Sequence, residues 1–371
     1  MELVVNLVKK YNFSTNLFIQ SYFIIIIKWF NSIKSISMKK PMLIFAVETS
    51  CDDTSVCIMT NNKKILSHIT HSQNEHARFG GIVPELASRS HLSILQKISK
   101  KALLEAKIQF KDIDYFCATC GPGLIGSLLV GSIFCKSLSI GGNKPFYPIN
   151  HLEGHILSTS FNNRITYPHL VVLLTGGHTQ IYLMHKVGVY EILGETLDDA
   201  IGEAFDKVGK LLGLSFPGGP KIEKEALLGK PNRFDLPHPL LKEKNLNFSF
   251  SGIKNYVNQL IKKHYPLDEN FVKDLSASFQ KKMFEIVEHK ILCCLKELAK
   301  RKIKISQISI VGGVSANNYI NYSLSKSLAK KNIDLLKPEK EMTGDNAAMI
   351  AWACNKRIAS SEPNLFFKPD P

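Results

Sequence analysis

Short apolar runs, separated by polar or glycine-rich turns, recur along the chain from residue 43 onward. The run at 43–59 predicts two strands joined by a polar turn, and 65–69 predicts a third. Helical spacing of apolar residues predicts the longest helix at 271–300, and another helix is predicted at 84–106. Further strands are predicted at 113–120, 144–149, 170–174, 180–184, 308–311 and 333–335, with a last helix at 347–357. This alternation is typical of an α/β fold.

The stretch 170–184 repeats the plan of 43–59, because each is a strand, a turn and a second strand. Duplicated halves around a cleft are the architecture of actin-like ATPases. We therefore expect two RNase H-like lobes. Residues 42–150, completed by 343–371, form the first, 151–342 form the second, and 1–41 lie outside the fold.

The composition is that of an ordinary globular protein with a basic surface. Of the 371 residues, 44% are hydrophobic and 21% are charged. Residues 1–40 hold six Lys against one Glu, so they supply +5 of the net charge of +15 and leave +10 for the rest. Such a surface suits a nucleic acid, although a Lys-rich proteome explains it equally well. Eight cysteines without a disulfide-scaffold spacing fit a reducing compartment, and Cys117 and Cys120 are predicted to be buried thiols.

The first forty residues allow three interpretations. The apolar run at 17–27 is shorter than the roughly 20 residues of a membrane span, and no small-residue cleavage site follows it. We favour a translation start placed too early, with Met38 or Met42 as the true start, over an organellar leader and over a membrane anchor. The expected location is the cytoplasm, or an organellar matrix if residues 1–37 are a leader.

His151 and His155 stand four residues apart, directly after a predicted strand. On a helix, residues at this spacing share one face, so both imidazoles can reach one metal ion. The spacing alone leaves two ordinary histidines as the alternative. Asp345, in the turn that opens the last predicted helix, offers a third ligand. Two His and one carboxylate leave open coordination positions, as in catalytic iron or zinc sites.

Glycine turns and an acidic cluster indicate a second kind of site. The backbone N–H groups of Gly176 and Gly177 can face a phosphate or acyl oxygen. Asp199, Glu203 and Asp206 have helical spacing, and the turn at 216–220 can bring the chain back towards Asp206, where a carboxylate can bind ribose hydroxyls. The alternative is a solvated acidic face. Phe248 and Phe250 are expected in the core rather than as platforms for bases.

These motifs together resemble the family of tRNA threonylcarbamoyladenosine transferases, in its bacterial and organellar branch. The resemblance covers about residues 42–358. It rests on Glu48-Thr-Ser-Cys-Asp52, Gly80-Gly-Ile-Val-Pro-Glu-Leu-Ala-Ser-Arg89, His151-x-x-x-His155, Gly176-Gly-His-Thr179, Gly312-Gly-Val-Ser-Ala-Asn317 and Asp345-Asn346. Asp53 stands where Glu is common, and Asn150 stands where a further His is common.

The resemblance implies an actin-like fold with a metal ion in its cleft. It implies His151, His155 and Asp345 as ligands of one divalent ion, with Fe²⁺ favoured and Zn²⁺ as the alternative. The implied residues that bind threonylcarbamoyl-AMP are Leu173, Leu174, Thr175, Gly176, Gly177, Asp206, Gly219 and Asn317. Asp52 is the implied catalytic residue, which would orient the incoming adenine.

The implied reaction moves the threonylcarbamoyl group to N6 of adenosine 37 in tRNAs that read codons beginning with A. The implied partners are tRNA, a shorter non-catalytic paralogue and a P-loop ATPase, or a second copy of the chain; no membrane is involved. Two alternatives come from other classes: a metalloprotease, suggested by the histidine spacing, and a non-catalytic ATP-binding partner. A metalloprotease usually carries His-Glu-x-x-His, which this chain lacks.

Overall fold

The computed structural model describes residues 40–79, 81–364 and 369–370, and within this part the strands form two sheets. The first sheet contains β1 (Leu43–Glu48), β2 (Asp53–Thr60), β3 (Ile65–Ser72), β4 (Tyr115–Gly121) and β5 (Phe146–Asn150). The second contains β6 (His169–Leu174), β7 (Thr179–Lys186), β8 (Val189–Glu195), β9 (Gln307–Val311) and β10 (Asp334–Leu336).

The two sheets have the same topology. Their orders are β3-β2-β1-β4-β5 and β8-β7-β6-β9-β10, so the first strand of each sheet lies at its centre. In each sheet the first three strands pair antiparallel, whereas the fourth pairs parallel with both the first and the fifth. The predicted duplication of an RNase H-like unit is therefore confirmed.

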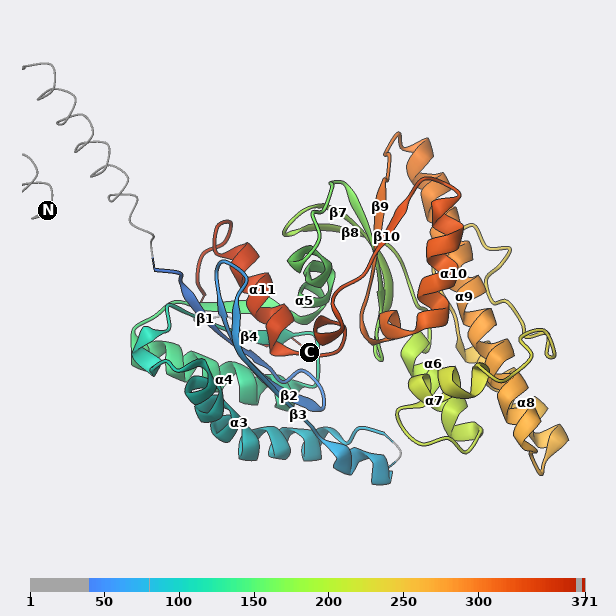
Figure 1. Ribbon diagram of the computed structural model, residues 1–371, viewed down its shortest axis with the longest axis horizontal. Helices are drawn as coiled ribbons and strands as arrows, with labels where there is room; N and C mark the ends of the chain where they lie inside the picture. The colour runs from blue at the N-terminus through green and yellow to red at the C-terminus, as the bar shows by residue number, and fades with distance from the viewer. Residues whose placement is uncertain (1–39, 80, 365–368, 371) are drawn as a thin grey trace, which may run out of the picture. The chain divides into compact units, whose positions relative to one another are not determined.

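Helices cover the outer faces of both sheets and fill the space between them (Figure 1). The described α-helices are α3 (Pro84–Ala106), α4 (Ile125–Gly142), α5 (His151–Ser158), α6 (Ile201–Leu211), α7 (Gly218–Ala226), α8 (Ser251–His264), α9 (Glu269–Lys300), α10 (Asn318–Ala329) and α11 (Ala347–Arg357). Short 3-10 helices lie at Asn74–Phe79, Phe110–Asp112, Thr159–Phe161, Gly313–Ala316 and Lys340–Met342.

The alternation of side chains along the central strands explains this layering. In β1, Phe45 and Val47 pack with residues of α3 on one face, whereas Ile44 and Ala46 pack with α5 and α11 on the other. In the second sheet, Val171 and Leu173 join the same middle cluster as α5 and α11. The short helix pair α5 and α11 is thus a layer shared by both sheets, as Figure 1 shows.

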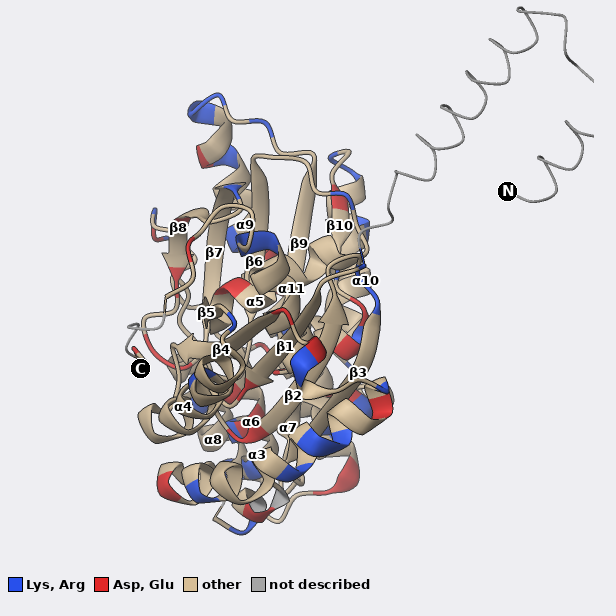
Figure 2. Ribbon diagram, turned by 90° about the vertical axis from the view of Figure 1, so that its left-hand side faces the viewer, with Lys and Arg blue, Asp and Glu red and all other residues tan. Residues whose placement is uncertain are grey.

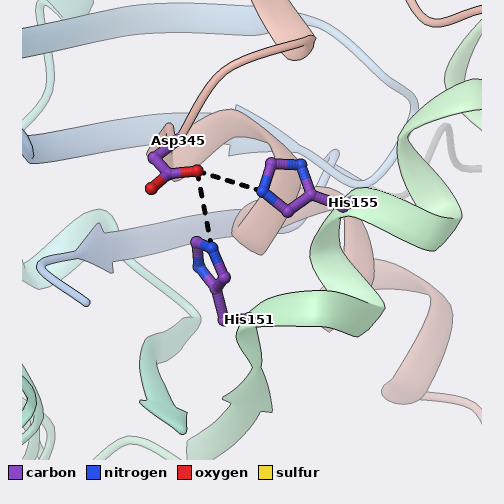
Figure 3. A group of neighbouring side chains, drawn as sticks. All are labelled: His151, His155 and Asp345. Atoms are coloured by element: carbon purple, nitrogen blue, oxygen red, sulfur yellow. Dashed lines mark hydrogen bonds and ion pairs between the residues drawn. The ribbon is translucent and has the colours of Figure 1, made fainter. Parts of the chain in front are cut away.

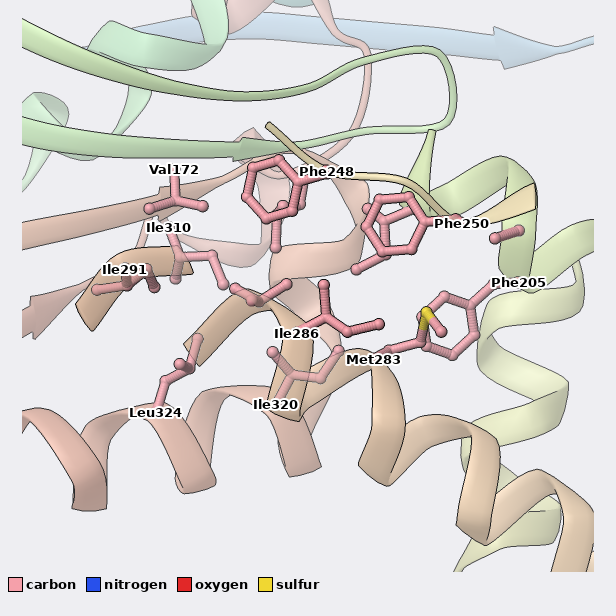
Figure 4. Close-up of a cluster of buried hydrophobic side chains, with 14 of the residues drawn as sticks. Val172, Phe205, Phe248, Phe250, Met283, Ile286, Ile291, Ile310, Ile320 and Leu324 are labelled. Atoms are coloured by element: carbon pink, nitrogen blue, oxygen red, sulfur yellow. The ribbon is translucent and has the colours of Figure 1, made fainter. Parts of the chain in front are cut away.

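The outer face of the second sheet packs on the largest core. Phe248 and Phe250 are fully buried there, and their stacked rings have centroids 6.0 Å apart. Both lie against Phe205 and the long helix α9 (Figure 4). The prediction that both phenylalanines belong to the core is confirmed. The predicted apolar stripe of 271–300 is confirmed as well, because Phe271, Leu275, Phe279 and Met283 are buried in this cluster.

The structure differs from the sequence-based expectations in two places. Residues 189–195, for which no strand was predicted, form β8 at the edge of the second sheet. The turn at 216–220, which was predicted only to bring the chain back towards Asp206, also begins α7, because Pro217 sits at the N-cap, where a helix needs no donor from it. The expectations for residues 1–37 lie outside the described residues, and the lobe boundaries stay a prediction.

One described helix, α4, is long and apolar enough to cross a membrane by length and composition. One face of α4 packs against α3 and β4, and Leu128 and Cys135 on that face are buried. Core helices of soluble proteins pass the same test.

His169 provides a test of the second sheet. Its imidazole is fully buried and its Nε2 lies 2.7 Å from Ser309 Oγ, and burial lowers its pKa from 6.5 to about 4. The unfolded chain therefore takes up this proton first as pH falls, so stability should be lost between pH 6.5 and pH 4. We expect the free energy of unfolding in urea to fall between pH 7 and pH 4.5 by about 2.5 kcal/mol more for wild type than for His169→Gln.

The matched control for this measurement is His185→Gln, since His185 lies in β7 of the same sheet but its side chain is exposed and contacts Glu191 at the surface. It should follow the wild-type pH dependence. Parallel curves for His169→Gln and wild type would show that the buried imidazole does not control acid stability.

Candidate active site

Helix α5 begins at the carboxyl end of β5 and carries both predicted histidine ligands. Asn150 is its N-cap, and the Asn150 Oδ1 accepts a hydrogen bond of 3.1 Å from the backbone N–H of Glu153. All eight residues of the helix are buried. The departure from the family pattern at position 150 therefore supplies a helix cap and removes no ligand.

His151, His155 and Asp345 converge, as Figure 3 shows. The Oδ1 atom of Asp345 lies 3.4 Å from His151 Nε2 and 3.0 Å from His155 Nε2. One ligand atom from each residue lies within 4.8 Å of the others, and the two imidazole rings are perpendicular. Two imidazole nitrogens and one carboxylate oxygen around one point are a donor set that fits Zn²⁺ or Fe²⁺.

Close packing of α5 on α11 brings these groups together. A Cβ atom on Gly154 would lie 2.9 Å from Ile350 Cδ1 and 3.2 Å from Met349 Cγ, so glycine allows the helices to approach. The side chain of Asn346 caps α11 by accepting from the N–H of Met349 at 2.9 Å, which fixes the residue that follows Asp345.

The cluster is a buried network of opposite charges. Burial alone would lower the pKa of His151, but Glu48 and Asp345 raise it well above its usual range. Burial alone would raise the pKa of Asp345, yet His151 and His155 hold it well below its usual range. Burial lowers the pKa of His155, which favours the neutral imidazole that a metal ion requires.

A cleft of about 870 Å³ opens beside this cluster. Several predicted site residues line it together, and the volume is within the usual range for a small-molecule site. They are Asp52, His151, Thr175, Gly176, Gly177, Asp206 and Asp345. A smaller cavity of about 270 Å³ lies next to it, lined by Gly176, Asp206, Gly219 and Asn317 among others.

The turn between β6 and β7 presents its backbone to the cleft. The N–H of His178 donates to Thr175 Oγ1 at 2.9 Å, which holds the turn closed. A Cβ added to Gly176 or Gly177 would meet nothing within 4 Å, so this part of the turn faces open space. Leu173 and Leu174 are fully buried in the central strand of the second sheet and line neither of these two cavities.

The acidic cluster divides into separate roles. Asp198 accepts hydrogen bonds from Phe250 N and Ser251 N, whereas Asp199 pairs with Lys207 and Lys254. Asp199 precedes α6, so it shares no helix face with Asp206. Glu203 and Asp206 both line the cleft, and Glu203 is paired with Lys207.

Asp206 meets the turn at 216–220, as predicted. Its Oδ1 accepts from Gly218 N at 2.7 Å, and burial raises the pKa of this carboxyl group. A Cβ on Gly218 would lie 2.8 Å from Asp206 Cα, which explains the glycine at this position.

Asn317 is buried and its side chain caps α10. Its Oδ1 accepts from Ile320 N at 2.9 Å, and its Nδ2 donates to Gln280 Oε1 at 2.8 Å. Gln280 was not predicted as part of the site. In the sequence, Gln280 is distinguished only as a polar residue beside the apolar stripe of a long helix.

Comparisons with known proteins identify the family of this chain. A family model described as tRNA N6-adenosine threonylcarbamoyltransferase matches residues 64–352. A relative of that name in Rickettsia massiliae is 47% identical over 313 residues, which cover 84% of this chain and 91% of the relative. A relative in Bartonella henselae is 44% identical over 334 residues, covering 86% of this chain and 92% of the relative.

A solved structure shows the same fold at low identity. Full-length HypF in its phosphate- and nucleotide-bound form aligns with a TM-score of 0.57 and 14% identity, over 88% of this chain and 57% of that one. The two-sheet architecture is the actin-like ATPase fold, here with a His-His-Asp cluster beside the interlobe cleft. The chain belongs to the tRNA N6-adenosine threonylcarbamoyltransferase family.

The ligand assignment can be tested by removing both imidazoles. We expect a His151→Ala/His155→Ala double variant to lose the bound metal, because one carboxylate cannot hold a divalent ion alone. Elemental analysis of the purified protein measures this loss. His178→Ala is the control, since His178 lines the same cleft but lies outside the cluster, and it should keep its metal. Full metal occupancy in the double variant would contradict the assignment.

Proposed function

We propose that this protein transfers the threonylcarbamoyl group from threonylcarbamoyl-AMP to N6 of adenosine 37 in tRNAs that read codons beginning with A. Membership of the family makes the chain an acyltransferase that acts on tRNA. The observation that carries the finer proposal is the cleft. It joins a cluster suited to a metal ion with a glycine turn and a carboxylate suited to a nucleotide.

The donor would lie across the β6–β7 turn. The N–H groups of Gly176 and Gly177 would face its acyl and phosphate oxygens, and Asp206 would accept hydrogen bonds from the ribose hydroxyls. We propose that the adjoining cavity, which Gly219 and Asn317 line, takes the adenine of the donor. Because the Asn317 side chain already caps α10, contacts at this end would come mainly from backbone groups.

The chemistry needs orientation more than a covalent enzyme nucleophile. The N6 nitrogen attacks the carbamoyl carbon, the bond from that carbon to the phosphate oxygen breaks, AMP leaves, and N6 loses one proton. A divalent ion held by His151, His155 and Asp345 would supply Lewis acidity for the acyl donor. Asp52, on the opposite turn of the cleft, is the residue we propose to orient the incoming adenine.

We propose one divalent ion per chain, with Fe²⁺ favoured and Zn²⁺ as the alternative. The geometry gives no support to the metalloprotease interpretation. Glu153, which lies between the two histidines, accepts hydrogen bonds from Tyr190 Oη at 2.5 Å and from Arg357 Nε at 3.0 Å. Its carboxylate is thus engaged away from the cluster and cannot activate a metal-bound water.

A basic surface supports tRNA as the acceptor. Residues from 41 onward carry a formal charge of +10, and Lys and Arg recur along α3 (Figure 2). Lys97 and Lys100 of this helix are exposed, whereas Arg89 and Lys101 pair with Glu85 and Glu105. Phosphate contacts of this kind contribute affinity without sequence information. We propose the cytoplasm as the place of action.

For protein partners we propose a shorter paralogue together with a P-loop ATPase, or a second copy of this chain. Exposed apolar residues on α4 support a protein contact on that helix. Ile125, Leu129, Ile133 and Ile140 are 39–67% exposed.

The reaction is tested directly on tRNA. Purified protein, its metal ion, threonylcarbamoyl-AMP and unmodified tRNA that reads a codon beginning with A should yield threonylcarbamoyladenosine by mass spectrometry of nucleosides. A tRNA with guanosine at position 37 is the control. Donor consumption without modified tRNA, in the presence of any required partners, would contradict the proposal.

Asp206 provides a test of the donor site. We expect Asp206→Ala to bind a non-hydrolysable adenylate analogue at least about tenfold more weakly, because each charge-assisted hydrogen bond contributes about 1.5–3 kcal/mol. Calorimetric titration measures the affinity. Metal content and tRNA binding should stay at wild-type values.

Two further variants separate the binding role from the structural one. Asp206→Asn keeps an acceptor for Gly218 N but loses the charge, so its affinity should fall between those of wild type and Asp206→Ala. Glu203→Gln removes a neighbouring acid that is already paired with Lys207, and it should bind as wild type does. Equal affinities for all variants would assign the nucleotide site to the glycine turns alone.

A further inference from the structure

Glu48, the last residue of β1, is a fully buried carboxylate. It contacts the ring nitrogen of His151 that does not face Asp345. Its Oε2 lies 3.0 Å from His151 Nδ1 and also accepts from Thr119 Oγ1. Its Oε1 accepts from the backbone N–H of Ser50 at 2.5 Å. Three donors from three segments thus hold this carboxylate in one position.

The duplicated topology shows that the sheet itself requires no acid here. The corresponding last residue of the central strand in the second sheet is Leu174, which is also fully buried. An unpaired carboxylate at such a depth is costly, so its retention in the first sheet points to a charged or hydrogen-bonding neighbour. That neighbour is His151.

The contact selects one tautomer of His151. A histidine that binds a metal ion is a neutral imidazole with one ring proton. Because an ionised carboxylate can only accept hydrogen bonds, that proton must lie on Nδ1 of His151, which faces Glu48. Ser50 Oγ lies 3.1 Å from the same nitrogen and is placed on the same side of the ring. The lone pair of Nε2 is then directed towards Asp345 Oδ1, 3.4 Å away, where the ligand atoms converge.

His155 lacks an equivalent contact. Its Nδ1 is buried and has no hydrogen-bond partner among the described residues. The two histidines therefore differ, because a carboxylate contacts Nδ1 of His151, whereas the ring of His155 has a carboxylate contact only through its Nε2, with Asp345.

We propose that Glu48 is a positioning residue that fixes the Nδ1–H tautomer of His151 and strengthens Nε2 as a metal ligand. This inference rests on the proposed metal centre. It assigns to Glu48 a function in metal affinity rather than in contact with the substrate. With Asp345, Glu48 also brings the fixed negative charge around the cluster to two, which matches a divalent ion held by two neutral imidazoles.

Glu48→Gln tests this role, because it keeps the shape of the side chain and removes the charge. We expect its dissociation constant for Co²⁺, measured by competition with a chelator, to rise about 10- to 100-fold over wild type. The visible absorption bands of the bound Co²⁺ should change as well. The melting temperature in the presence of chelator reports folding separately.

Glu153→Gln is the matched control. Glu153 is a buried glutamate on α5 between the two histidines, but it binds Tyr190 and Arg357 on the other side. Because the amide oxygen of glutamine can still accept from Tyr190 and Arg357, the packing of α5 on α11 should persist, and this variant should keep the Co²⁺ affinity and absorption bands of wild type. If Glu48→Gln does not fold, Glu48→Asp keeps the charge but withdraws it from Nδ1, and it should also bind Co²⁺ more weakly.

Three results would overturn the inference. Glu48→Gln or Glu48→Asp could bind Co²⁺ with wild-type affinity and bands. Glu153→Gln could lose as much affinity as Glu48→Gln, which would assign the effect to general destabilisation. Wild type itself could fail to bind Co²⁺, and that result would remove the proposed metal centre as well, whereas the first two leave it standing.

Discussion

The packing of α5 against α11 is the contact on which the rest of the site depends. Both helices lie between the two sheets, and each sheet turns one face of its central strands towards them. Helix α5 carries His151 and His155, and Asp345 lies directly before the N-cap of α11. A change in the spacing of the two lobes would therefore change the spacing of the ligands.

Two features hold this middle layer at close distance. Gly154 removes the one side chain that would keep α5 from Met349 and Ile350. Glu153 connects α5 to α11 through Arg357 and to the second sheet through Tyr190 of β8. The sequence between the two histidines, Leu-Glu-Gly, is thus explained by packing and by a buried ion pair rather than by catalysis.

The sequence predicted the fold well wherever burial leaves a regular pattern. Strands β1, β4 and β6 are buried on both faces, so they appear as short apolar runs, and α9 shows its apolar stripe because its buried face lies on the second sheet. Strand β8 was missed because it is an edge strand with mixed exposure. Its backbone pairing with β7, a tertiary contact, determines the strand and leaves little trace in local composition.

The site was predicted in its residue types but not in all its contacts. His151, His155 and Asp345 were found by spacing and by resemblance, and the structure brings them together. Two partners of predicted site residues were not found. Glu48 contacts His151 across 103 residues of the chain and Gln280 contacts Asn317 across 37, so both contacts depend on the fold. Among Glu48, Asp52 and Asp53, sequence alone could not show which carboxylate turns inward.

The duplicated lobes have diverged in charge at the same topological place. The segment that follows the central strand of the first sheet begins at Glu48 and contains Asp52 and Asp53, whereas its counterpart after β6 is Thr175-Gly-Gly-His178 without an acid. Negative charge is therefore concentrated on the side of the cleft where a cation fits. Gly176 and Gly177 line the other side, where we propose that their backbone N–H groups face the phosphate and acyl oxygens of the donor. The same turn, present once in each sheet, would under this proposal hold the cation and the anionic donor on opposite walls of one cleft.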